Sequence, residues 1–149
     1  MVKTAIAPLS KMKKAVVLLD SDDPQIEQTL KAIDKFFTPK GIEVKKYVFC
    51  FKEKKELTGC IPVYSYNRGI FGTIISRSKR VDRNVDMFIS LLSPDIWLSR
   101  YEASCSKAEF KIGRAQIKKD IYDFVLTGSE GKSLNAVFLA IADILEKVN

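Results

Sequence analysis

The chain contains no histidine among its 149 residues, and this absence restricts the chemistry that it can perform. Histidine is the commonest general base, and it activates the nucleophile in the usual Ser-His and Cys-His pairs. It is also the commonest metal ligand at neutral pH. The composition therefore favours a protein that binds over one that catalyses, without excluding an enzyme, and we expect no catalytic residue, resident metal ion or cofactor.

Cysteines and long apolar runs are also scarce. The three cysteines, Cys50, Cys60 and Cys105, are an odd number without metal-ligand spacing, which indicates free thiols in a reducing compartment. No apolar run approaches the roughly 18 residues that span a bilayer. The stretch from Met1 to Lys14 lacks the apolar core of a secretory signal. We therefore predict a soluble, cytoplasmic protein that does not enter membranes.

Positive charge is what the chain has in excess. It carries 25 Lys and Arg residues against 18 Asp and Glu residues, for a formal net charge of +7. A positive field favours anionic partners, but it does not choose among nucleotides, nucleic acids and phospholipid headgroups. The length is that of one domain, and we find no repeat or linker. The sequence therefore predicts a single domain over residues 1–149.

The first elements are the most clearly patterned. The continuous apolar run Ala15–Leu19 predicts a strand buried on both faces, as at the centre of a parallel sheet. Asp23 is suited to cap a helix that begins with Pro24. The run Pro39-Lys40-Gly41 predicts the end of that helix. Its apolar residues share one face: Ile26, Leu30, Ile33 and Phe37.

The rest of the chain alternates predicted strands and helices. Further strands are predicted at residues 42–51, 95–99, 109–112 and 122–126, with a short edge strand at 61–66 and a loop or flap at 69–80. Helices are predicted at 81–92, 101–108 and 134–148. This alternation indicates an α/β fold, a Rossmann-like three-layer sandwich with a mostly parallel sheet of about five strands.

In such folds, ligands bind outside the carboxyl ends of the strands. Asp20 follows the first strand, and Arg100, Lys111 and Arg114 lie at or near the ends of the third and fourth. We therefore predict that these four residues bind a small anionic ligand or a protein partner. Other interpretations remain open, since Lys111 could point outward from an edge strand and Arg114 could pair with a nearby aspartate.

The run Leu18–Asp22 resembles the D-x-D motif of haloacid-dehalogenase-like phosphatases. The resemblance implies a magnesium-assisted phosphatase or phosphotransferase with Asp20 as nucleophile and Asp22 as general acid. The chain departs from that pattern because Pro24 leaves no room for a flap, and Thr127 stands where a later acidic pair is expected. Acidic residues are also favoured at any helix N-terminus by capping and by the helix dipole.

The run Leu126–Ser133 is a near miss to a Walker A phosphate loop. It has the Gly-Lys-Ser ending, but Leu126 replaces the first glycine. The sixteen residues after Ser133 leave too little chain for a later strand with a magnesium-holding aspartate. A polar turn that caps the last helix, or a weak anion site on its amides, is the simpler interpretation.

A basic segment predicts nucleic-acid binding as a further alternative. Cations interleaved with aromatic side chains can neutralise phosphates and stack bases, although the chain carries no RNP, KH or helix-turn-helix signature. A solvated basic loop explains the same residues. The cations are Arg68, Arg77, Lys79, Arg80 and Arg83, and the aromatic residues are Tyr64, Tyr66 and Phe71.

Several runs together resemble a family of small bacterial α/β proteins of unknown function. The most specific is Ser106–Arg114, with the sequence SKAEFKIGR, and the similarity extends over most of the chain after about Ala15. The same region is faintly similar to the N-terminal half of two-domain heptosyltransferases, where it helps to form the acceptor side. That likeness implies parallel pairing of two strands, but not glycosyl transfer, because the donor-binding half is missing.

Overall fold

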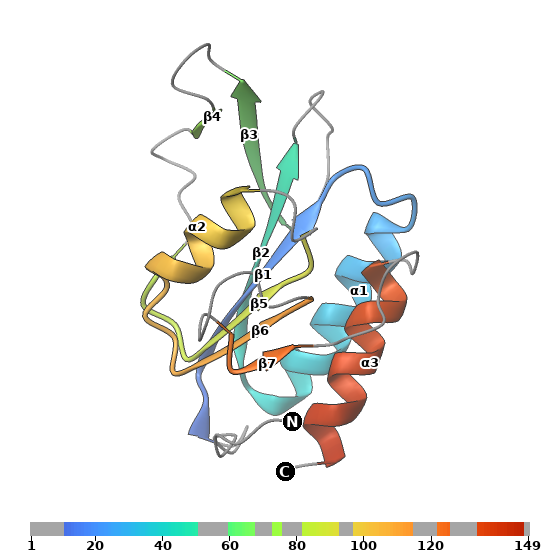
Figure 1. Ribbon diagram of the computed structural model, residues 1–149. Coiled ribbons are helices and arrows are strands. Elements are labelled where there is room, and N and C mark those ends of the chain that lie inside the picture. The colour runs from blue at the N-terminus through green and yellow to red at the C-terminus, as the bar shows by residue number, and fades with distance from the viewer. Residues whose placement is uncertain are drawn as a thin grey trace.

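The computed structural model describes residues 11–50, 60–67, 73–75, 82–92, 97–114, 122–125 and 134–147 (Figure 1). They form one sheet of seven strands in the order β4-β3-β2-β1-β5-β6-β7. All neighbours are parallel except β3 and β4. The strands are β1 (Lys14–Asp20), β2 (Glu43–Cys50), β3 (Ile61–Asn67), β4 (Thr73–Ile75), β5 (Met87–Ser90), β6 (Phe110–Gly113) and β7 (Phe124–Val125).

Helices cover both faces of this sheet. Helices α1 (Ile26–Phe37) and α3 (Leu134–Lys147) lie side by side on one face, and α2 (Trp97–Cys105) lies on the other (Figure 1). The predicted α/β class, its layered arrangement and its mostly parallel sheet are confirmed, with more strands than the five expected. Within the part of the chain that the structure describes, no helix is long and apolar enough to cross a membrane.

The continuous apolar run of β1 places it at the centre of the sheet, as predicted. Its side chains from Ala15 to Leu19 are all buried because both faces are covered. Ala15, Val17 and Leu19 pack against α1 and α3, whereas Val16 and Leu18 belong to the cluster that includes Ala103 of α2. Full burial of a Val or Leu side chain stabilises the folded state by roughly 1.5–3 kcal/mol. Burial on both faces therefore holds β1 at the centre of the sheet.

Helix α1 begins two residues later than the sequence predicts. Its N-cap is Gln25, not Asp23. The Asp23 carboxylate still holds the approach to the helix, because it accepts the Gln25 amide at 3.2 Å and the Thr29 hydroxyl at 3.0 Å. At the other end, the short helix η2 (Thr38–Lys40) leads to Gly41 at φ 71°, a left-handed conformation that glycine adopts without steric cost. The predicted helix end is therefore confirmed.

The helix predicted at 81–92 is wrong, because this segment contains strand β5. Val85, Phe88, Ile89 and Leu92 fit a helical spacing, but Met87 and Leu91 between them are buried as well. A strand covered on both faces has no alternation, and a short apolar run then fits either element. Residues 87–90 form a strand because they pair with β1 on one side and with β6 on the other.

The strand predicted at 95–99 is also wrong where the structure describes it. Trp97–Ser99 form the first turn of α2, which extends the helix predicted at 101–108 toward the N-terminus. Strands β5 and β6 are parallel neighbours, so the chain must return along the sheet between them, and such crossovers usually contain a helix. The predicted strands near 42–51, 109–112 and 122–126 and the last helix are confirmed.

Strand β3 is longer than the predicted edge strand and is paired in two halves. Residues 61–64 pair with β2 in parallel, and residues 65–67 pair with β4 in antiparallel. Pro62 lies among residues 61–64, which pair on one side only among the described strands. The N–H group that proline lacks therefore interrupts no hydrogen-bonded ladder. Beyond this half, the β3–β4 pair projects past the carboxyl edge of the sheet (Figure 1).

Candidate functional site

The first part of the candidate site is the turn that follows β1. The Asp23 amide donates to the Asp20 carbonyl at 3.1 Å, and the Asp22 amide donates to the Asp20 carboxylate at 2.9 Å. The Ser21 amide continues the pairing with β2 by donating to the Phe49 carbonyl at 3.0 Å. Asp20 is half-buried, whereas Asp22 is exposed. These bonds fix the Asp20 carboxylate at the carboxyl edge of the central strand.

The chain reverses its direction through the sheet at this position. From β1 it passes through α1 to β2 on one side, and from β5 it passes through α2 to β6 on the other side and opposite face. With the antiparallel β4 left out, the strands have the order 3-2-1-4-5-6, which is found in doubly wound folds. The switch point lies between β1 and β5, where folds of this topology bind ligands.

Arg114 reaches toward that switch point from β6. It follows the last residue of the strand, and its Nη1 donates to the Leu91 carbonyl at 3.3 Å. Leu91 in turn directly follows β5, and its amide donates to the Leu18 carbonyl of β1 at 2.9 Å. The half-buried guanidinium therefore lies along the carboxyl edge, directed from β6 toward the two strands that flank the switch point.

Lys111 lies on the α2 face of the sheet rather than at its carboxyl edge. Its Nζ donates to the Ala103 carbonyl of α2 at 2.7 Å, and its amide donates to the Asp123 carboxylate at 2.8 Å. These contacts join β6 to α2 and to the approach to β7. Arg100 belongs to the first turn of α2, but its side chain lies outside the described part of the structure. The four predicted residues are therefore not all brought to one point.

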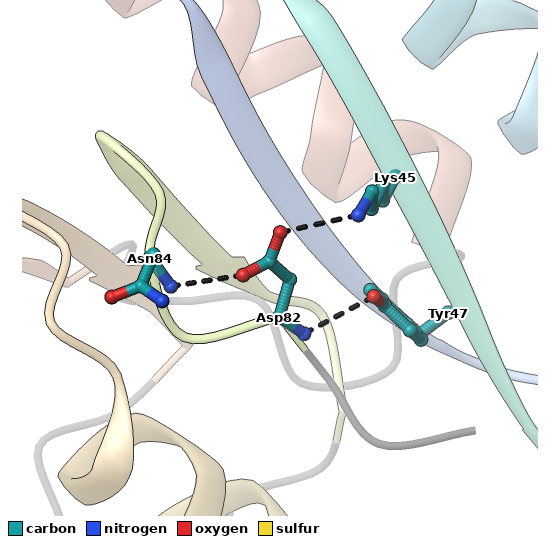
Figure 2. A network of polar contacts seen from close by, with 4 residues as sticks. All are labelled: Lys45, Tyr47, Asp82 and Asn84. Carbon is teal, nitrogen blue, oxygen red and sulfur yellow. Dashed lines mark hydrogen bonds and ion pairs between the residues drawn. The ribbon is translucent and has the colours of Figure 1, made fainter. Parts of the chain in front are cut away.

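A second polar group, which the sequence did not predict, lies before β5 (Figure 2). The Lys45 ammonium pairs with the Asp82 carboxylate at 3.1 Å, and the Asp82 amide donates to the Tyr47 hydroxyl at 3.1 Å. The Asn84 amide donates to the second Asp82 oxygen at 3.0 Å. Lys45 and Tyr47 are two residues apart on β2 and so share one face, a period-2 signal that could have indicated a common partner.

The pKa values of this group reflect its pairing. The hydrogen bond to Asp82 raises the pKa of Lys45 above its ordinary value. Burial raises the pKa of Asp82, but the Asn84 amide and Lys45 outweigh it, so this pKa is lowered overall. Burial raises the pKa of the Tyr47 hydroxyl, which therefore remains protonated. Each charged member thus has an opposite partner, and the group anchors the chain that enters β5.

Of the cations in the basic segment that predicts nucleic-acid binding, the structure describes Arg83. The Arg83 guanidinium lies 5.9 Å from the centre of the Tyr101 ring on α2, and Tyr101 is 46% exposed. Arg68, Arg77, Lys79 and Arg80 lie outside the described residues, as do the phosphate-loop-like run at 126–133 and the side chains of Tyr64 and Tyr66. The nucleic-acid alternative therefore stays a prediction.

The described cysteines do not form a metal site. Cys60 and Cys105 form no disulfide and are half-buried, and the sequence predicts thiols for these two. Over the described ranges, no group of three or more cysteines or acidic residues has the geometry to hold a metal ion. Asp20 and Asp22 are adjacent in the turn after β1, but they belong to no such cluster.

The comparisons with known proteins identify a family but no activity. No curated protein and no solved structure is detectably similar to this chain, so the likeness to heptosyltransferases has no support. Residues 2–141 match a family of unknown function, DUF6913. The match extends over nearly all of the sheet and helices, including Asp20, Arg100, Lys111 and Arg114. The chain therefore belongs to the DUF6913 family of unknown function.

Proposed function

We propose that this protein is a non-catalytic binding domain that takes a small anionic ligand at the carboxyl edge of its sheet. The observation that carries the proposal is the Arg114 guanidinium, which lies along that edge next to the switch point. A guanidinium has five N–H donors in a planar fork, and it binds carboxylates and phosphates through two parallel hydrogen bonds.

The environment of Arg114 supports this role. The Leu91 carbonyl restrains the guanidinium, so less side-chain entropy is lost when an anion binds. Partial burial lowers the local dielectric constant and strengthens the attraction to an anion. The net charge of +7 adds a long-range field of the same sign. Arg100 starts from the same edge in the first turn of α2 and remains a predicted second contact.

Thermal unfolding with a panel of phosphorylated and carboxylated metabolites tests the proposal. A free ligand at a hundredfold excess over its dissociation constant stabilises the folded state by about 2.7 kcal/mol. For a domain of this size, that energy corresponds to a rise in Tm of roughly 5–11 °C. Arg114→Ala should abolish the rise. Lys31→Ala removes the same charge from an exposed position on α1 and should leave it intact.

Two results would overturn the proposal. One is the absence of any rise in Tm across the panel, which is also the result expected of a domain that binds a protein partner instead. The other is magnesium-dependent release of inorganic phosphate from panel members that disappears in Asp20→Asn. That outcome would establish the phosphotransferase alternative, because the acid-to-amide change removes the nucleophile while keeping the shape of the side chain.

A further inference from the structure

We draw no further inference here: the strongest candidate, the surface patch on the outer side of α2 where the Arg83 guanidinium lies 5.9 Å from the centre of the half-exposed Tyr101 ring, carries none because nothing in the structure shows what covers it.

Discussion

Replacing Gly113 by alanine tests how closely β6 packs against Tyr122. A Cβ atom at this position would lie 2.5 Å from Cε2 and Cζ of the Tyr122 ring and 2.7 Å from its Cδ2. The ring is buried, with 6% of its surface exposed, so it cannot swing aside into solvent. Overpacking of this kind typically costs about 1–3 kcal/mol. Replacing glycine by alanine in a strand gains about 0.5–1 kcal/mol, so the expected net loss is roughly 1–2 kcal/mol.

Urea unfolding followed by circular dichroism measures this loss. In a domain of this size, the Tm should fall by about 2–8 °C in parallel. The decisive measurement is a double-mutant cycle with Tyr122→Ala, which removes all three ring atoms near the new Cβ. In that background, Gly113→Ala should lose its cost and become neutral or stabilising. An equal cost in both backgrounds would refute the steric explanation.

Gly41→Ala provides the matched control for this cycle. Gly41 has φ +71°, and a Cβ there would meet no atom within 4 Å. Its cost, about 1–2 kcal/mol, comes from the left-handed backbone and not from a neighbour. Tyr122→Ala should therefore leave the cost of Gly41→Ala unchanged. The comparison separates a glycine required by close packing from one required by its dihedral angles.

Two further predictions concern the core and the start of β1. Phe138→Ala should lower the free energy of unfolding in urea by about 3–5 kcal/mol, because the ring packs against Phe36 and Phe37. Leu139→Ala, at the half-exposed neighbour, should lower it by less than about 1 kcal/mol. Equal losses in the two variants would contradict the packing of α3 on α1. The amides of Lys13 and Lys14 hold the pKa of Asp86 below its ordinary value, so its contribution to stability is complete above about pH 4 and is lost as the pH falls through the lowered pKa. The stability gap between wild type and Asp86→Ala should therefore shrink on acidification, and a gap that widened would refute this coupling.

Some elements could be predicted because the pattern that marks them lies in residues that are close together in the sequence. The run Ala15–Leu19 is apolar throughout, which is typical of a short strand covered on both faces. The apolar stripes of α1 and α3 repeat at the helical period over a dozen or more residues. Gly41 marks a left-handed helix end that few other residues tolerate.

The candidate site was predicted in part. Asp20 could be placed at the carboxyl edge because it follows an unambiguous strand, and Arg114 because it follows Gly113 at the end of another. The predicted place of Lys111 did not reveal that its amine donates to the Ala103 carbonyl, because this contact depends on how α2 packs on the sheet. The network of Lys45, Tyr47 and Asp82 was missed because Asp82 lies 35 or more residues along the chain from the other two.

By itself, the sequence determined the α/β class, the central position of β1, the C-terminal end of the first helix and the presence of the last helix, because these depend on local periodicity and backbone preference. The identity of 87–90 as a strand and of 97–99 as a helix was decided by tertiary structure, since short apolar runs fit either element until their neighbours are known. The strand order was decided in the same way. It creates the switch point between β1 and β5 and brings Arg114 to Leu91, through backbone pairing that no single segment encodes.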